Sequence, residues 1–119
     1  MAIPSRPIHP IHPLPVPTLE RIIELHLQES LAFATGQPNG EPLWSAIRVA
    51  ASDYLMTLFL SGTLKGAKPE EAYFVRCDRS TMTQNDIDNG RIIVVVGFAP
   101  TQPAEFVVIN ISLLTATQP

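Results

Sequence analysis

Residues 82–99 read MTQNDIDNGRIIVVVGFA, a polar turn that leads directly into a hydrophobic, β-branched run. Thr83 can cap a single helical turn in which Asp86 holds the third position, and Gly90 can stop that turn. The run Ile92–Val96 is typical of a strand that is buried on both faces in the middle of a sheet. This stretch therefore predicts a short capped helix followed by the central strand of the domain.

Two further strands are predicted around this one. Ala72–Cys77 reads as a strand, and so does Phe106–Ile111. The connection that contains Pro100 and Pro103 is compatible with antiparallel pairing of the last two runs. We expect nothing beyond the last strand to cover its edge, and an uncovered edge is a place where another chain can pair.

The first half of the chain predicts two amphipathic helices. Thr18 can cap the first helix, whose apolar residues recur at helical spacing until Gly36. Pro42 suits the first position of the second helix, and Gly62 can end it in a left-handed conformation. The residues expected to face inward are Leu19, Ile22, Ile23, His26, Leu27 and Phe33 in the first helix and Leu43, Trp44, Ile47, Ala51, Tyr54, Leu55 and Leu58 in the second.

The predicted fold class is α+β, with two helices packed on one face of a small, mainly antiparallel sheet and with extended N- and C-terminal arms. Half of the 12 prolines lie in residues 1–17, at positions 4, 7, 10, 13, 15 and 17. Because prolines supply no amide donors, we expect this segment to be an extended, polyproline-like arm. The α+β domain is expected at residues 18–114, followed by a flexible tail at residues 115–119.

Composition narrows the classes of function. The 119 residues suit a single core, and the 8 basic and 11 acidic residues give a formal net charge of −3 with no long block of either sign. This balance argues against a nucleic-acid partner. One cysteine excludes an internal disulfide framework and suits a reducing cytoplasm. No uninterrupted apolar segment reaches the ~18 residues of a membrane helix, so membrane integration is not expected.

Candidate catalytic residues have simpler structural interpretations. Cys77, Asp78 and His26 could supply a nucleophile, an orienting acid and a base. A lone cysteine at a strand end is more often a small buried hydrophobic residue, and a histidine in an apolar helical row is more often a core or boundary residue. We therefore expect no catalytic residues.

Candidate cofactor and metal sites are also incomplete. His9 and His12 would form a weak metal site without a third and a fourth ligand. The spacing of Asp86, Asp88 and Gly90 lacks the glutamate of a calcium loop. The glycines around Leu64 lack the lysine and serine that end a nucleotide-binding loop. No cofactor and no metal are expected.

Several motifs together point to one family. They are Asn39-Gly40-Glu41-Pro42-Leu43-Trp44, Gly62-x-Leu64-x-Gly66, Phe74-Val75-Arg76-Cys77-Asp78, Thr81-Met82-Thr83, Asp86, Gly90 and Pro103-Ala104-Glu105-Phe106. This set resembles the C-terminal domain of contractile tail sheath proteins, which build bacteriophage tails and the related contractile injection systems. The resemblance spans roughly residues 18–112.

The resemblance implies a structural subunit, not an enzyme, that polymerises around a tail tube, exchanges strands with its neighbours and drives the tube out on contraction. The implied partners are other copies of this chain or longer sheath subunits, and a tail-tube protein. The implied location is a phage tail (virion) or a contractile injection particle, assembled in the bacterial cytoplasm.

The resemblance also assigns roles to particular residues. The implied interaction residues are Phe106, Val107, Val108, Ile109, Asn110, Ile111 and Leu113 in the C-terminal strand and Ile8, Ile11, Leu14 and Val16 in the N-terminal arm. The implied structural motif comprises Trp44, Gly62, Gly66, Thr83, Asp86, Gly90 and Pro103.

The chain departs from this family at its start. Typical sheath proteins are several hundred residues long, with outer domains and an arginine-rich strand before the first helix, where this chain has Ile8–Pro17. It could be a minimal sheath-like subunit, a cap or adaptor at one end of a sheath, or a fragment whose partner piece is encoded separately. Two alternatives from other classes are a small peptide-binding interaction module and an enzyme that uses Cys77 and His26.

Overall fold

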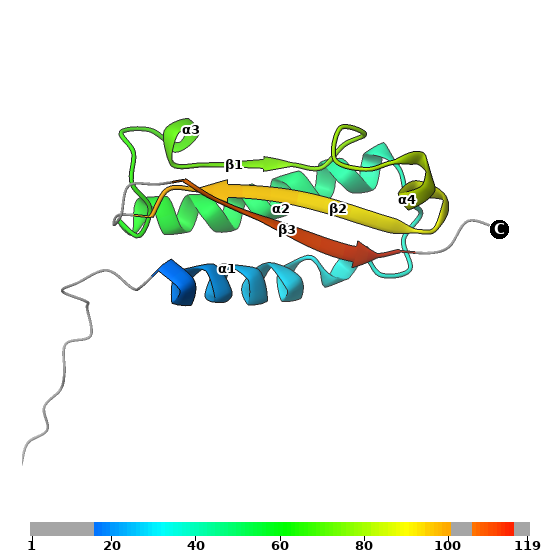
Figure 1. Ribbon diagram of the computed structural model, residues 1–119, viewed down its shortest axis with the longest axis horizontal. Coiled ribbons are helices and arrows are strands. Elements are labelled where there is room, and N and C mark those ends of the chain that lie inside the picture. Colours follow the sequence, from blue (N-terminus) through cyan, green and yellow to red (C-terminus); the bar gives the residue numbers. More distant parts are fainter. Residues whose placement is uncertain (1–15, 101–105, 116–119) are drawn as a thin grey trace, which may run out of the picture.

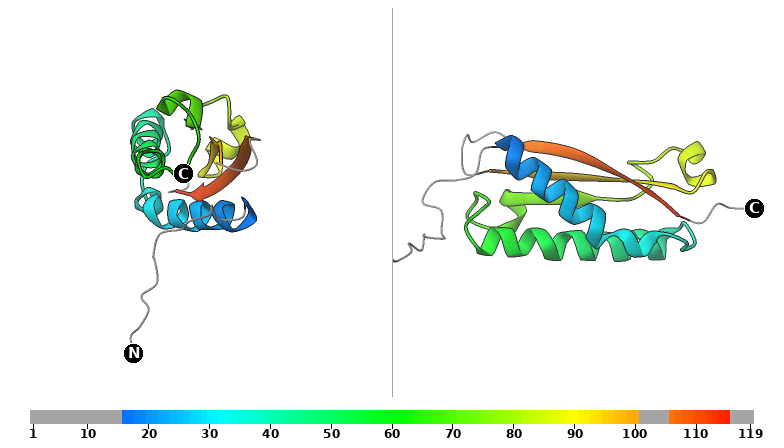
Figure 2. Two further views of the ribbon diagram at one scale, coloured as in Figure 1. Left: turned by 90° about the vertical axis from the view of Figure 1, so that its left-hand side faces the viewer. Right: turned by 90° about the horizontal axis from the view of Figure 1, so that it is seen from below.

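The computed structural model describes residues 16–100 and 106–115. In chain order the elements are α1 (Val16–Ser30), the 3-10 helix η1 (Ala32–Ala34), α2 (Glu41–Leu60), α3 (Pro69–Ala72), β1 (Tyr73–Arg76), α4 (Gln84–Asp88), β2 (Arg91–Phe98) and β3 (Val107–Leu114). The two long helices and the sheet form two layers (Figures 1 and 2). The predicted α+β class is confirmed.

The three strands form one antiparallel sheet in the order β1, β2, β3. β2 is the central strand, as its β-branched sequence predicts. β3 pairs with β2 of its own chain over its full length, from Val107 opposite Phe98 to Leu114 opposite Arg91. The last strand is therefore a member of the chain's own sheet, and β1 and β3 are the two edges.

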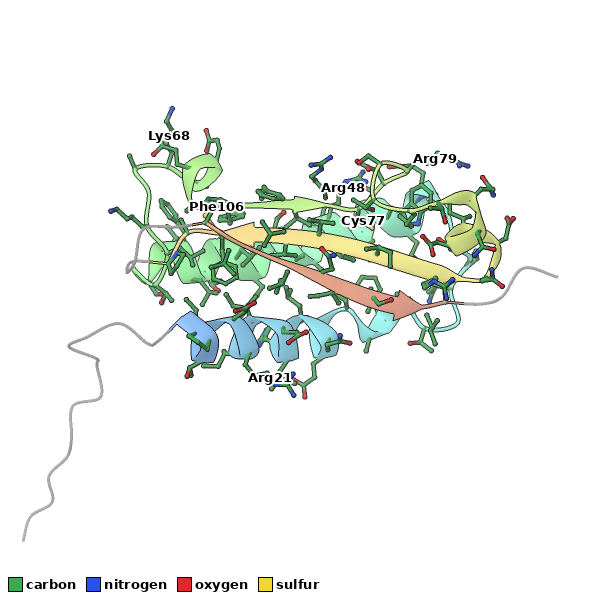
Figure 3. The ribbon with its side chains drawn as sticks, viewed as in Figure 1. Arg21, Arg48, Lys68, Cys77, Arg79 and Phe106 are labelled. Atoms are coloured by element: carbon green, nitrogen blue, oxygen red, sulfur yellow. The ribbon has the colours of Figure 1, made fainter. Side chains whose placement is uncertain are left out.

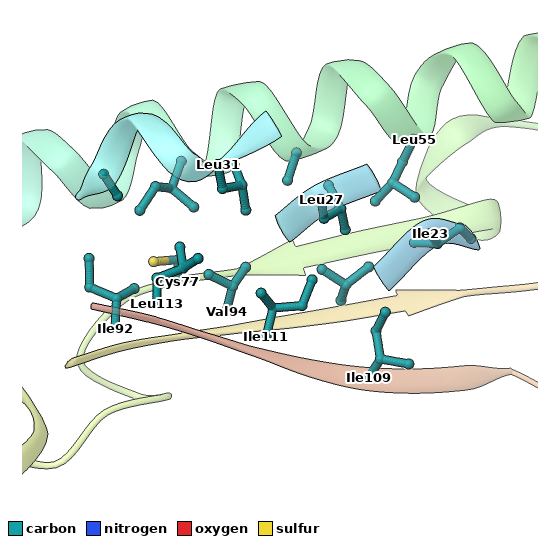
Figure 4. Close-up of a cluster of buried hydrophobic side chains, with 14 of the residues drawn as sticks. Ile23, Leu27, Leu31, Leu55, Cys77, Ile92, Val94, Ile109, Ile111 and Leu113 are labelled. Carbon is teal, nitrogen blue, oxygen red and sulfur yellow. The ribbon is translucent and has the colours of Figure 1, made fainter. Parts of the chain in front are cut away.

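The core lies between the helices and one face of the sheet. Alternate residues of β2 and β3 point into it, because successive side chains of a strand point to opposite faces. Ile92, Val94 and Ile111 are fully buried there and face α1 and α2 (Figure 4). Burial of such a side chain stabilises the folded state by about 1.5–3 kcal/mol. From the helices the core receives Leu19, Ile23, Leu27, Leu31, Leu43, Trp44, Ile47, Ala51 and Leu55.

The prediction that the central strand is buried on both faces is wrong. Ile93 and Val95 alternate with the buried residues of β2 and are only half-buried. Their side chains lie on the face of the sheet opposite the core, here called the open face, which also carries Phe74, Val108 and Asn110. A continuous apolar run therefore does not require two covered faces.

The first helix also differs from its prediction. α1 begins at Val16 rather than after a cap at Thr18, and Pro17 is tolerated because the first turn of a helix needs no amide donors. Ile22, His26 and Phe33 were expected to face inward but are exposed, Ile22 by 44% and Phe33 by 43%. Phe33 falls out of the helical row because α1 ends at Ser30 and a 3-10 turn follows. Within the described ranges, no helix combines the length and the apolar character needed to cross a lipid bilayer.

Candidate assembly surface

The candidate assembly surface is the outer edge of β3. In an antiparallel pair only alternate residues of an edge strand direct their backbone donors and acceptors at the partner strand, so the others point outward. β3 contacts α1, and in Figure 1 the strand crosses diagonally toward the end of that helix. A groove of about 340 Å³ lies between them, here called the edge groove, and is lined by Pro17, Glu20, Arg21, Glu24, Val108, Ile109 and Asn110. A chain that paired with β3 would enter this groove.

The predicted interaction strand divides its side chains between two environments. Ile109, Ile111 and Leu113 are buried in the chain's own core. Val108 is 53% exposed and Asn110 is also exposed, and both line the edge groove. The buried positions therefore serve the fold, and only the outward positions are accessible to a neighbour.

An aromatic pair occupies the open face near the start of β3, where Figure 3 labels Phe106. The rings of Phe74 and Phe106 are stacked, with centroids 5.8 Å apart and an interplanar angle of 5°. Gly97 is the register partner of Phe74, and a Cβ at this glycine would clash with the Phe74 ring. The glycine thus allows the ring to lie across β2. This contact was not predicted from the sequence, although an isolated glycine in a strand pattern signals a close approach of another group.

The turn before β2 is held by a reciprocal cap. The Thr83 side chain accepts a hydrogen bond from the Asp86 amide at 3.0 Å, and the Thr83 amide donates to Asp86 Oδ2 at 3.0 Å. Arg91 Nε donates to Asp86 Oδ1 at 2.9 Å. The hydrogen bond from the Thr83 amide, followed by that from Arg91, holds the pKa of Asp86 below its usual value. Gly90 ends the turn with a φ of +72°, and its carbonyl accepts from the Thr115 amide at 2.7 Å.

The other residues of the predicted structural motif also support the fold. Trp44 is 4% exposed, and its Nε1 donates to Asn39 Oδ1 at 2.7 Å. The Asn39 amide group in turn donates to the carbonyl of Ile87, so α2 is tied to α4. Gly62 follows α2 with a φ of +85°, and Gly66 has a φ of +151° where it packs against Ala72.

The thiol of Cys77 is unsuited to nucleophilic catalysis. Its residue is fully buried, and burial raises the pKa of the thiol to about 12. Arg48, which Figure 3 labels near Cys77, donates from Nη1 to the Cys77 carbonyl at 2.6 Å and from Nη2 to Glu41 Oε2 at 2.8 Å. His26, the candidate base that the sequence offers, stacks on Tyr54 with ring centroids 3.8 Å apart. Among the described residues, no three His, Cys, Asp or Glu side chains are grouped so as to hold a metal ion.

Some predicted residues lie outside the described part of the chain. They are Ile8, Ile11 and Leu14 of the N-terminal arm, Pro103 of the structural motif, and residues 116–119 of the tail. Val16, the remaining residue predicted in the arm, is the first residue of α1.

Comparison with known proteins places this fold among large assemblies. No protein-family model and no curated protein matches the chain. A chain of the cryo-EM structure of the anti-feeding prophage (AFP) baseplate, 6-fold symmetrised, is 37% identical with a TM-score of 0.68. A chain of the PVC sheath complex of an extracellular contractile injection system, in the contracted state, is 41% identical with a TM-score of 0.67.

These two similarities cover most of this chain but a minor part of the solved chains. Each covers 85% of this chain and 27% of the other. The chain therefore spans about a quarter of the length of the solved chains that it matches.

Proposed function

Since this chain is sheath-like, similar in sequence and in fold to proteins of contractile injection systems, we propose that it is a structural subunit of a contractile sheath or sheath-like assembly. The similarity at 37–41% identity is the observation that carries this proposal. It supports the family resemblance that the sequence motifs indicate. In this role the chain polymerises around a tail tube, and contraction of the polymer ejects the tube.

The edge of β3 supplies the contact between subunits. A terminal segment of a neighbour pairs with the outward backbone groups of β3 and lies in the edge groove between β3 and α1. Main-chain hydrogen bonds give this contact its affinity, and exposed side chains such as Val108 and Asn110 select the register. An acceptor edge on one subunit and a donor segment on the next make a heterologous contact, which builds filaments when it does not close into a ring.

The proposed partners are other sheath subunits. Because the solved chains that it matches come from a multi-subunit sheath complex and a baseplate, we propose other copies of this chain and longer sheath proteins as its partners. A cap or adaptor at one end of a sheath is the second candidate within this class. A small peptide-binding module would use the same edge but would stay monomeric.

Light scattering combined with negative-stain electron microscopy tests the proposal. The purified chain is measured over a concentration series, alone, with a candidate tail-tube protein and with a longer sheath protein of the same system. Rings, tubes or a mass that grows with concentration are expected for a sheath-type subunit. A monomer at every concentration that ignores both the tube protein and longer sheath subunits would contradict the proposal and favour the peptide-binding module.

A further inference from the structure

α1 and η1 expose an apolar stripe on the side away from the core. Ile22, Leu25 and Phe33 form this stripe and are 44%, 50% and 43% exposed. One hollow along it, of about 610 Å³, is lined by Ile22, Leu25, His26, Gln28, Glu29 and Ala32. A second, of about 440 Å³, is lined by Phe33, Gln37, Pro38, Gly40, Pro42, Leu43 and Ala46. The two linings meet at the consecutive residues Ala32 and Phe33, and a contiguous apolar surface of this kind marks an interaction site.

The sequence before α1 carries a matching pattern with a period of three residues. Prolines occupy positions 4, 7, 10 and 13, aliphatic residues occupy positions 8, 11 and 14, and histidines occupy positions 9 and 12. A polyproline II helix has three residues per turn, so each series would fall on a face of its own. Successive aliphatic side chains would then stand about 9 Å apart along one face.

The same prolines exclude this segment as an added strand. Backbone groups of a strand point alternately to the two sides, so a strand can pair only if its prolines all fall on one parity. Here Pro4 and Pro10 are at even positions, whereas Pro7, Pro13 and Pro15 are at odd positions. In every register, some of these prolines would face the partner strand without an amide donor. This arm therefore requires a different mode of contact from the strand pairing proposed at β3.

We propose that residues 8–14 of one copy bind the apolar stripe of a neighbouring copy as a polyproline II helix, with Ile8, Ile11 and Leu14 in the two hollows. Polyproline segments are recognised in apolar grooves that contain aromatic side chains, the role that Phe33 plays here. This inference rests on the proposed function, because it names a second link between subunits of the same assembly.

Charge complementarity favours this occupant. Residues 1–15 contain Arg6 and two histidines but no acidic residue. Glu29 lines the larger hollow and is the one acidic or basic (Asp, Glu, Lys or Arg) residue in the linings of the two hollows, whereas Glu20 and Glu24 of α1 line the edge groove. Electrostatic attraction between the basic arm and the carboxylate of Glu29 therefore favours binding of the arm at this hollow.

The conformational restriction of the arm favours a neighbour over its own helix. Each of the residues Ile3, Arg6, His9, His12 and Leu14 precedes a proline and is restricted to extended conformations, which disfavours the tight reversal that contact with its own α1 would need. Extended at ~3.1 Å per residue, residues 8–14 reach as far as about 25 Å from the start of α1, which is far enough to contact an adjacent copy.

Cysteine cross-linking in the full-length chain tests the inference. An Ile11→Cys variant is mixed with a Leu25→Cys variant under mild oxidation, and a disulfide-linked heterodimer is expected on a non-reducing gel. The native Cys77 is buried and does not compete. The matched control pairs Ile11→Cys with Leu60→Cys, because Leu60 is 73% exposed but lies outside both hollows. Leu25 and Leu60 are 50% and 73% exposed, so these two substitutions remove no fully buried side chain, and circular dichroism verifies the fold of every variant.

The outcomes separate this inference from the proposed function when scattering is recorded on the same samples. A heterodimer specific to position 25 supports the inference, whether or not polymers form. Polymers without this cross-link, or equal cross-linking at position 60, would overturn the inference alone. If neither polymers nor the cross-link is observed, both this inference and the proposed function are overturned. A disulfide that forms only within the Ile11→Cys/Leu25→Cys double variant would assign the arm to its own helix and refute the contact between copies.

Discussion

Gly97 is the residue at which the packing of the open face can be tested most directly. We expect Gly97→Ala to lower the free energy of unfolding by about 1–3 kcal/mol, because the new Cβ displaces the Phe74 ring. Urea denaturation measures this loss. In the Phe74→Ala background the same substitution should cost much less, because no ring remains to be displaced. An equal cost in both backgrounds would mean that the Phe74 contact is not the cause.

The cap of α4 predicts a dependence of stability on pH. Since the pKa of Asp86 is lowered in the folded state, its carboxylate stabilises the fold above its unfolded pKa of about 3.9. This contribution is lost as the pH falls through the folded pKa. Urea denaturation at pH 7 and pH 3 should therefore show a smaller acid-induced loss for Asp86→Asn than for the native chain. Asp88→Asn, which leaves the contacts of Thr83 and Arg91 intact, should keep the native pH dependence.

Thr83 provides an independent measure of the same cap. Thr83→Ala removes the acceptor for the Asp86 amide and should cost about 1 kcal/mol of unfolding free energy at pH 7. Thr83→Ser keeps the hydroxyl and should restore most of the stability. If serine were no better than alanine in thermal or urea denaturation, the hydroxyl contact would not be the source of the stabilisation.

At the scale of the element, β3 combines a buried face and an exposed face with different roles. Ile111 is fully buried, and Ile111→Ala should cost about 2–5 kcal/mol of unfolding free energy. Deletion of residues 106–119 should therefore unfold the domain as well as abolish assembly. A stable, folded product of this deletion, detected by circular dichroism, would show that β3 is not needed by the chain's own sheet.

The exposed face of β3 should affect assembly without affecting folding. Val108→Lys places a charge in the edge groove, and we expect it to raise the concentration needed for polymerisation by tenfold or more while the urea midpoint stays within experimental error of the native value. Leu114→Lys is the matched control, because Leu114 is 66% exposed on the same strand but does not line the groove. Equal effects of the two substitutions on scattering would argue against the groove as the subunit contact.

For the assembled protein, the place of the chain in a tube distinguishes a subunit from a cap. A tagged chain is mixed with a longer sheath protein of the same system at increasing ratios. A subunit should be incorporated along the tubes, whereas a cap should bind only at tube ends and shorten the tubes as its concentration rises. Gold labelling of the tag and the distribution of tube lengths in electron micrographs measure both effects.

Local sequence determined the elements of this protein. The β-branched run from Ile92 to Val96 sufficed for the central strand, and Thr83 with Asp86 sufficed for a capped turn before it. Pro42 near the start of α2 and Gly62 after its end marked that helix. Such signals can be read from a sequence because backbone dihedral preferences and capping hydrogen bonds act between residues only a few positions apart.

The tertiary structure decided which surfaces those elements share. Ile93 and Val95 are β-branched apolar residues like their buried neighbours in β2. They lie on the open face only because both long helices pack on the other side of the sheet. Phe74 meets Gly97 through strand register, and β3 borders α1 through the folding of segments about 90 positions apart in the sequence. Which residues are buried and where grooves form depends on contacts between segments that are far apart in the sequence, and a local sequence pattern does not specify those contacts.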